Sequence, residues 1–465
     1  MTTSAIRVPP VAGLASRAPA WLTAIVSGLL ACGLAWLILN RPTLAGIVVL
    51  PFAALPLVLS GQVRTLVFVL GSLAVFQSSD ELTSQKILFF GAVMLSFGVV
   101  LTRLPQLVQT TAYRDLLPLL RASVVLFVVI AVSFVVSYAN DVPQKPWLRD
   151  VGPYVLVACA PFFALDAQAS FSRRGLRRLV VIAGTLGAFA FTVVWLTNRM
   201  IADLSFIPIG LGTMLLPAAA FAYAMSEFLD GGRARLGWLA LASAIPAMML
   251  TTGTRTTLLL AVVPVAIVFG GRRRFTGRSL RLLVAVPLVA IFGLATIQGV
   301  VEVTGGNRDV LAKRFSLFSE IGTGDDQSYR DRVAQTSAAW DLFRSSPLTG
   351  VGPGVDIAWN DSFGRPHLSP NVDSPVSFLT KYGVLGIVAL GFLVGGYVGV
   401  LRRLRARTGR RTVAQYALIG YGATIAAWSL LVNSLEDKGL SIGLVVLLAL
   451  AAREAAEYQR PDSYP

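Results

Sequence analysis

Long apolar stretches recur along almost the whole chain, and they constrain the fold more than any other feature. Stretches of roughly 17–25 apolar residues are each long enough to cross about 30 Å of hydrocarbon as a helix. Barrel strands would be about 10 residues long and would alternate in polarity, and the sequence lacks that pattern. It therefore predicts an all-α, polytopic integral membrane protein with about 14 transmembrane helices. These are expected near residues 20–39, 43–60, 65–77, 86–101, 122–138, 151–167, 178–197, 209–228, 238–251, 256–270, 282–300, 376–401, 415–434 and 440–455.

The charge distribution predicts how these helices are oriented. Only 14% of the residues are charged, against about 25% in a typical soluble domain. With the N-terminus in the cytoplasm, the inner side receives 25 basic and 7 acidic residues, and the outer side receives 15 and 17. The short basic loops 173–178, 272–274 and 402–411 all fall inside. Because cytoplasmic loops carry an excess of Lys and Arg, both termini are predicted to be cytoplasmic.

This orientation divides the chain into five parts. They are a cytoplasmic tail at 1–19, helices 1–11 at 20–300, an extracytoplasmic (periplasmic) loop at 301–371, helices 12–14 at 372–455 and a cytoplasmic tail at 456–465. The expected location is the bacterial cytoplasmic (inner) membrane, with membrane lipids as partners. The net charge of +16 is explained by topology, so nucleic acid is not expected as a partner. Cys32 and Cys159 lie in separate predicted helices, which indicates neither a disulfide framework nor a cysteine-rich metal site.

The loop at residues 301–371 is the only long connection, and loops of this length are usually functional or disordered. Within it, Val333, Thr336, Ser337, Trp340 and Phe343 recur at helical spacing, which predicts an amphipathic helix from Ser328 to Arg344. The turn-rich run 347–354 follows. Its three glycines lack the Gly-Lys-Ser/Thr ending of a phosphate-binding loop, so we interpret the run as a tight turn that directs the chain back to the membrane.

Basic residues on the outer side are the first candidates for a binding site. Lys86 opens the fourth helix, Arg255 lies between two apolar helices with almost no loop, and Arg330 and Arg332 begin the loop helix. Each of them could instead be an interfacial residue whose charge reaches toward water. Together they would suit a diphosphate, which Arg can hold with two hydrogen bonds and Lys as a point charge.

Several motifs resemble the bacterial O-antigen ligase and O-antigen polymerase superfamily. The loop reads Arg314-Phe-Ser-Leu-Phe, then Asp325-Asp-Gln-Ser-Tyr-Arg-Asp-Arg332, then Ala339-Trp-Asp-Leu-Phe343 and Pro347-Leu-Thr-Gly-Val-Gly-Pro-Gly354. The segment Phe378-Leu-Thr-Lys-Tyr-Gly383-Val-Leu-Gly386 is similar to that family's re-entry into the membrane. The run Thr-Gly-Thr-Arg255-Thr-Thr resembles its earlier arginine motif. The resemblance covers roughly residues 251–390.

The resemblance implies a membrane fold like that of C-type (GT-C) glycosyltransferases and a reaction outside the cytoplasmic membrane. The donor would be a glycan on undecaprenyl diphosphate, and the acceptor a glycan or glycolipid. No metal and no cofactor are expected. Arg255 and Arg332 are expected to hold the donor diphosphate, with Lys86 as a third cation. Arg330 is the alternative to Arg332, because two residues apart on a helix differ by about 200° in direction.

The catalytic base is left open between two residues. The family carries a His just before the re-entry helix, where this chain has Val372-Asp373-Ser374-Pro375. His367, the chain's only histidine, lies a few residues earlier. A neutral imidazole is a suitable proton acceptor near neutral pH, whereas a carboxylate beside arginines is a weaker base. We therefore consider His367 first and Asp373 second.

A multi-helix transporter or a flippase for lipid-linked oligosaccharides is the alternative function. Such a protein would need charged residues deep within helices around a cavity. In this sequence the predicted spans are nearly free of charges, which gather at the outer ends instead. This pattern favours chemistry at the membrane surface and a role in cell-surface polysaccharide synthesis, as a ligase or as a polymerase.

Overall fold

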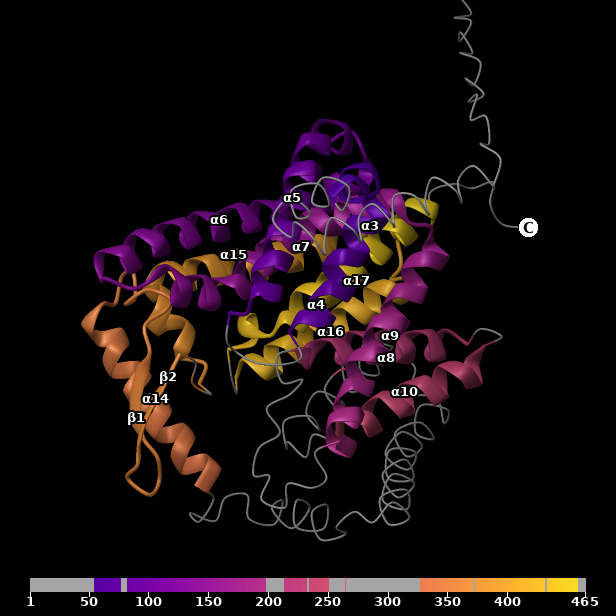
Figure 1. Cartoon of the computed structure of the whole chain (residues 1–465). Coiled ribbons are helices and arrows are strands. Elements are labelled where there is room, and N and C mark those ends of the chain that lie inside the picture. The colour runs from indigo at the N-terminus through magenta and orange to yellow at the C-terminus, as the bar shows by residue number, and fades with distance from the viewer. Residues whose placement is uncertain are drawn as a thin grey trace, which may run out of the picture. The chain divides into compact units, whose positions relative to one another are not determined.

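The computed structural model describes residues 54–76, 82–197, 213–231, 234–250, 264, 327–370, 372, 374–430 and 433–458. The chain forms two compact units, Met1–Leu59 and Ser60–Pro465. In the first unit the described residues 54–59 are helical. The second unit contains all the elements discussed below (Figure 1).

The elements of the first half of the second unit are all helices, joined by turns. Most of them lie where an apolar stretch predicts a helix, and several extend beyond it, whereas residues 61–64 lie between two predicted helices. For example, the helix predicted at 122–138 begins at Thr111, because backbone hydrogen bonding continues past the end of the apolar run. The elements are α3 Gly61–Leu66, the π-helical η1 Val67–Gly71, α4 Ser72–Val75, α5 Ser84–Leu107, α6 Thr111–Ala139, α7 Gln144–Ser170, α8 Arg173–Thr197, α9 Leu215–Asp230 and α10 Arg235–Leu250.

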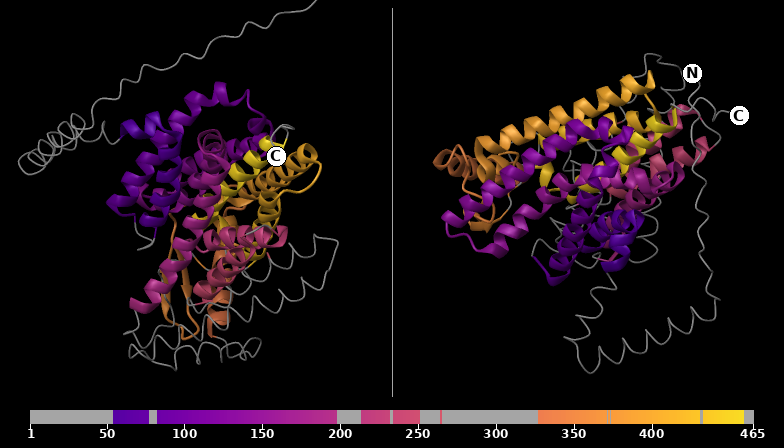
Figure 2. Two further views of the ribbon diagram at one scale, coloured as in Figure 1. Left: turned by 90° about the vertical axis from the view of Figure 1, so that its right-hand side faces the viewer. Right: turned by 90° about the horizontal axis from the view of Figure 1, so that it is seen from above.

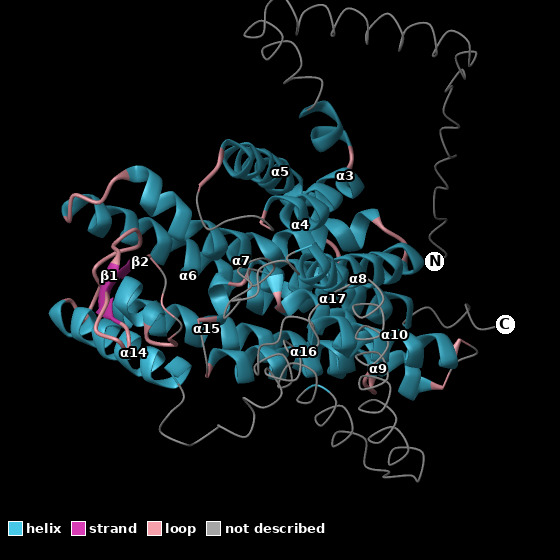
Figure 3. Ribbon diagram, turned by 60° about the horizontal axis from the view of Figure 1, so that its bottom comes forward, coloured by secondary structure: helices cyan, strands magenta, loops and turns pink. Residues whose placement is uncertain are grey.

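The second half adds further helices and a short β-hairpin to the expected all-α fold. The elements are α14 Gln327–Ser345, β1 Ile357–Asn360, β2 Pro366–Ser369, α15 Ser377–Thr408, α16 Val413–Ser429, the 3₁₀ turn η3 Ser434–Glu436 and α17 Lys438–Tyr458. The strands are antiparallel and pair Trp359 with His367 (Figure 3). The helices predicted at 20–39 and 282–300 lie outside the described residues, as do most of 43–60 and all of 256–270 except residue 264.

Five of the described helices are long and apolar enough to cross a membrane: α5, α6, α7, α15 and α17. They differ in how much of their surface is covered by protein. In the most apolar part of α17, 89% of the residues are buried, against 22% in α15. Exposed apolar residues on α6 and α15, such as Val135 and Phe392, are typical of surfaces that contact lipid. We therefore place α7 and α17 at the centre of the helices and α5, α6 and α15 around them.

Helix α15 runs along α6 in close contact (Figure 2). A small residue permits this approach, since a Cβ atom at Gly396 would lie 2.9 Å from the carbonyl oxygen of Pro118. Small residues at helix interfaces let backbones pack closely where lipid provides no hydrophobic driving force. The contact between α6 and α15 positions the loop at 301–371, because its residues 347–354 contact the end of α6 and the loop continues into α15.

The glycine-rich run 347–354 is the tight turn that the sequence predicts. Gly350, Gly352 and Gly354 all have positive φ angles between 70° and 91°. A Cβ at Gly350 would lie 2.5 Å from the backbone carbon of Lys381, so a side chain is excluded by space as well as by conformation.

Helix α15 is broken at Gly383, which has φ 59° and ψ −153°. The break leaves backbone groups of α15 without partners inside the helix, and the glycine turn supplies them. The amides of Val384 and Leu385 donate to the carbonyls of Pro347 and Leu348 at 2.9 and 3.2 Å. Irregular backbone at membrane depth is tolerated where protein satisfies its hydrogen bonds, as here.

Helix α14 confirms the helix predicted for the loop, but its buried face differs from the predicted apolar stripe. Val333 and Trp340 are exposed, whereas Ala339 is fully buried against Ile357 and Val372. The alanine face allows close contact with the hairpin and with α15, where the Thr380 hydroxyl donates to the Ala339 carbonyl at 2.8 Å. Larger side chains could not approach so closely, so they lie on the outer face of α14.

The two ends of the helices carry different kinds of residue. The glycine turn contacts the end where α6 meets α7, with the Asn140 side chain donating to the Val351 carbonyl at 2.9 Å. We call this the loop end. At the opposite end of α7, Asp166 binds both Arg64 and Arg103, at 2.8 and 2.6 Å. The basic loops 173–178 and 402–411 lie at the end away from α14, whereas loop 272–274 lies outside the described residues. Which end faces the cytoplasm stays a prediction.

Candidate functional site

The candidate residues fall into two groups at the loop end, and two of them lie outside the described residues. Arg330 and Arg332 are on α14 and His367 is on β2, so all three belong to the α14–hairpin module. Lys86 is in the first turn of α5. Arg255 and Asp373 lie outside the described residues, and their roles stay predictions.

Helix α14 and the hairpin are joined by direct contacts. The amide of Ser362 donates to the carboxylate of Asp331 at 2.7 Å. Arg330, on one side of Asp331, is exposed, whereas Arg332, on the other side, is half-buried. The two arginines therefore have different surroundings, which agrees with their expected difference in direction on the helix.

His367 is held by two contacts within the hairpin. Its Nε2 atom lies 3.1 Å from Oδ2 of Asp361, and its ring stacks on Trp359 with centroids 4.7 Å apart. Burial acts to raise the pKa of Asp361, but hydrogen bonds from the Arg365 amide and the His367 ring hold that pKa below its usual value. When the neutral imidazole donates from Nε2 to this carboxylate, Nδ1 is left as a proton acceptor. The imidazole is 45% exposed, so Nδ1 chemistry with an outside molecule is possible.

Lys86 is not an exposed interfacial residue, because it is only 4% exposed. Its Nζ atom lies 5.9 Å from the centroid of the Phe76 ring, and Nζ of Lys438 lies 5.7 Å from the same centroid. Two ammonium groups from different helices therefore gather against one aromatic ring. We call Lys86, Phe76 and Lys438 the two-lysine cluster.

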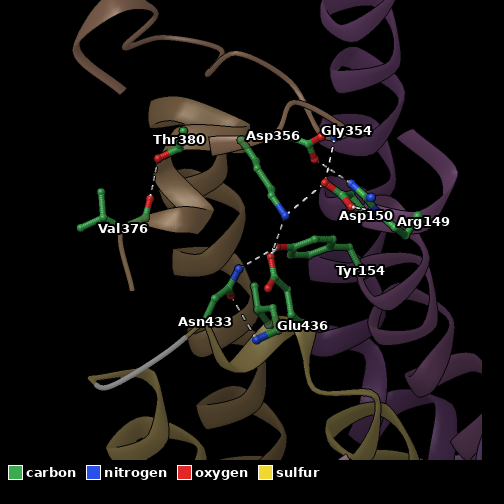
Figure 4. A network of polar contacts seen from close by, with 11 residues as sticks. Arg149, Asp150, Tyr154, Gly354, Asp356, Val376, Thr380, Asn433 and Glu436 are labelled. Atoms are coloured by element: carbon green, nitrogen blue, oxygen red, sulfur yellow. Dashed lines mark hydrogen bonds and ion pairs between the residues drawn. The ribbon is translucent and has the colours of Figure 1, made fainter. Parts of the chain in front are cut away.

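A buried polar network includes residues of the segment just before Lys438 (Figure 4). Lys381, on α15, is 1% exposed, and its Nζ lies 3.0 Å from Oε1 of Glu436 and 3.3 Å from Oδ2 of Asp150. The hydroxyl of Tyr154 donates to Glu436 at 3.0 Å, and Asn433 donates to the Tyr154 oxygen at 2.7 Å. The network thus connects α7, α15 and the segment before α17.

Asp150 also connects this network to the loop. It accepts the backbone amide of Gly354 at 2.9 Å and the Nε of Arg149 at 2.7 Å. Arg149 reaches Asp356 at 3.4 Å, just before β1. The ammonium of Lys381 is neutralised by two carboxylates, so its role is to fix the glycine turn and the α14–hairpin module rather than to bind an anion.

Asp437 has a structural role at the same end. It accepts the amide of Gly439 at 2.7 Å and that of Leu215 at 3.2 Å, so one carboxyl caps the first turns of both α17 and α9. Burial raises the pKa of Asp437 to about 7, although these amides oppose the shift.

The sequence interpretation missed Lys381, Lys438 and the partners of Lys381. A signal was present, since Lys381 is a charged residue inside a predicted span and such residues are functional candidates. Lys381 lies within the motif Phe378–Gly386, which we interpreted only as the re-entry of the chain into the membrane. Its partners Asp150 and Glu436 are 231 and 55 residues away along the chain, so only the tertiary structure identifies them.

Comparison with known protein families gives a match for the part of the chain that contains α14 and the hairpin. The O-antigen ligase family model matches residues 238–391. This range contains most of α10, all of α14 and the hairpin, and the beginning of α15 through the break at Gly383. A comparison with curated proteins gives no match.

Proposed function

Because residues 238–391 carry a domain of the O-antigen ligase and polymerase superfamily, we propose that this membrane protein transfers or polymerises a glycan carried on a polyprenyl diphosphate. The observation that carries the proposal is this match, which includes α14 with Arg332 and the hairpin with His367. We further propose that the reaction takes place at the outer face of the cytoplasmic membrane, since the loop predicted on that side carries Arg332 and His367.

In the proposed reaction, a hydroxyl oxygen of the acceptor attacks the anomeric carbon of the donor glycan. The bond from that carbon to the diphosphate oxygen breaks, and the polyprenyl diphosphate leaves with the bonding electrons. The hydroxyl proton goes to Nδ1 of His367, whose Nε2 faces Asp361. Asp373 is the alternative base.

The leaving diphosphate requires positive charge close to its oxygens. We propose that Arg332 and Arg255 supply charge-assisted hydrogen bonds, and that Lys86 contributes a point charge. Lys438 adds a second ammonium beside Lys86, since both lie against Phe76. The proposal needs no metal, so a chelator should leave transfer unchanged.

The test uses variants of the arginines in a strain that lacks the gene. Arg332→Ala and Arg255→Ala should each abolish transfer and cause lipid-linked glycan to accumulate. A desolvated contact of this kind contributes about 2–5 kcal/mol. Arg330→Ala removes the same charge from an exposed position two residues away and serves as the matched control, with a mild effect.

Membrane abundance of each variant is measured alongside, so that loss of protein is not taken for loss of activity. Wild-type transfer by Arg332→Ala with loss in Arg330→Ala would reverse the assignment of the two arginines. Normal glycan profiles in all three variants, at normal abundance, would contradict the proposed function.

A further inference from the structure

A hollow that is open to the surface, which we call the cavity, lies at the end of the helices opposite to the proposed catalytic residues. It has a volume of about 460 Å³ and is lined by Thr111, Arg114, Asp115, Arg403, Ala406 and Arg407. The first three lie in the first turns of α6 and the others near the end of α15. The cavity therefore joins two peripheral helices of the membrane bundle, away from the loop end.

The charges of the lining are unbalanced. Arg407 binds the Asp115 carboxylate through Nη1 and the Thr111 hydroxyl through Nη2, the latter at 2.7 Å. Asp115 therefore neutralises one arginine of the three. Arg114 and Arg403 are exposed, and they add two positive charges with no further carboxylate in the lining.

The third arginine forms the wall of the cavity. The Arg407 side chain is 10% exposed, and its Nε is enclosed by protein without a hydrogen-bond partner among the described residues. An outside anion would therefore meet Arg114 and Arg403, whose side chains are exposed. The adjoining N-terminal turn of α6 also favours an anion through its helix dipole.

We propose that this cavity binds a phosphate group, carried by the headgroup of an anionic membrane phospholipid. Guanidinium groups match the oxygens of a phosphate, and basic pockets between membrane helices are suited to acidic headgroups. Arg114 and Arg403 would flank the phosphate, while the Arg407–Asp115 pair forms the wall between them. The site is separate from the proposed transfer reaction and would anchor the α6–α15 pair in the lipid bilayer.

The test measures lipid binding by the full-length protein purified in detergent. Phosphatidylglycerol, but not phosphatidylcholine, should raise the melting temperature of the wild type in a saturable way. The double variant Arg114→Gln/Arg403→Gln should weaken this apparent affinity about tenfold or more, the loss expected from a charge-assisted contact. A matched control is Arg402→Gln/Arg405→Gln, which removes the same charge from exposed positions of α15 outside the cavity lining.

Two further measurements distinguish a loss of binding from a loss of folding, and a lipid headgroup from a soluble phosphate. Arg403 also donates to the Arg114 carbonyl, so the single variant Arg114→Gln, which keeps that bond, must weaken phosphatidylglycerol binding as well. Inorganic phosphate is tested as a competitor. Competition at millimolar concentration would support the phosphate site but assign it to a soluble anion. Equal losses in both double variants, or an unchanged preference for phosphatidylglycerol in the cavity variant, would overturn the proposal.

Discussion

At the scale of single residues, His367 is distinguished by its surroundings rather than by its position in the motif. Stacking on Trp359 orients the plane of its imidazole ring, and the Asp361 carboxylate holds its Nε2 atom. A histidine with a carboxylate on one nitrogen can accept a proton on the other. This arrangement favours His367 as the base, although the family pattern expects a histidine nearer Asp373.

His367→Ala should reduce turnover by about 10²–10⁴-fold with a smaller effect on donor binding, the range typical of a positioned base. His367→Gln should not restore activity, because an amide cannot accept the proton at neutral pH. Turnover and donor binding are measured in these variants and in Asp373→Ala and Asp373→Asn. Inactive Asp373 variants together with a fully active His367→Ala would assign the base to the carboxylate instead.

Asp361→Asn tests the second contact of the imidazole. The neutral amide is a weaker hydrogen-bond acceptor than the carboxylate, so the imidazole is held less firmly and turnover should fall while donor binding changes less. The measurement is turnover and donor binding beside the wild type. Unchanged turnover would show that Asp361 only shapes the hairpin.

Lys381 shows how one buried charge can be required for the fold. Lys381→Met would remove the cation of Glu436 and leave Asp150 with Arg149 alone, and breaking such a buried pair costs about 3–5 kcal/mol. We expect a large fall in melting temperature in detergent. Lys438→Met is the control, since Lys438 is only half-buried, and its effect on stability should be much smaller. Similar stability of both variants would contradict the bridging role of Lys381.

At the scale of elements, the break in α15 and the glycine turn depend on one another. The turn supplies hydrogen bonds to the broken helix, and the break creates room for the turn. Through Asp150 and Gly354 the same contacts hold the α14–hairpin module on α7. The orientation of Arg332 and His367 is therefore set by backbone geometry at Gly350 and Gly383.

Gly383→Ala should reduce both stability and transfer. A Cβ there would lie 2.5 Å from the amide nitrogen of Gly350, and the backbone angles are almost restricted to glycine, at a cost of about 1–3 kcal/mol or more. Gly391→Ala is the control in the same helix, because its Cβ would meet no atom within 4 Å. It should be neutral or slightly stabilising. Equal behaviour of the two variants, in melting temperature and transfer, would argue against the interlocked turn.

At the scale of the whole molecule, the two ends of the helices differ in the residues that they carry. The loop end carries the α14–hairpin module and the two-lysine cluster, and the opposite end carries the basic loops 173–178 and 402–411 and the cavity lined by arginines. The positive-inside rule assigns the second end to the cytoplasm.

Cysteine labelling in intact cells tests this orientation. Introduced cysteines at Ser328 and Arg405 lie at opposite ends, and an impermeant reagent should modify only the first. Both native cysteines, Cys32 and Cys159, lie in predicted helices, so a Cys-free background removes their contribution. Labelling of position 405 from outside would reverse the orientation and would move the proposed reaction to the cytoplasmic face.

The sequence by itself predicted the membrane class, most of the described helices and the helix within the long loop. Apolar length and charge asymmetry are local properties, and they act on each segment whatever its neighbours are. For the same reason α14 was predictable, and so was the need for glycine at positions 350, 352 and 354. The family resemblance depended on short motifs, which are equally local.

Only the tertiary structure decided which residues meet. The apolar stripe of α14 was predicted at Val333 and Trp340, but the alanine face is buried, because the hairpin and α15 approach too closely for larger side chains. Lys381 finds its partners on α7 and η3, and Lys438 joins Lys86 at Phe76. Burial and ion pairing depend on distances between segments far apart in the chain, and no periodicity in one sequence encodes those distances.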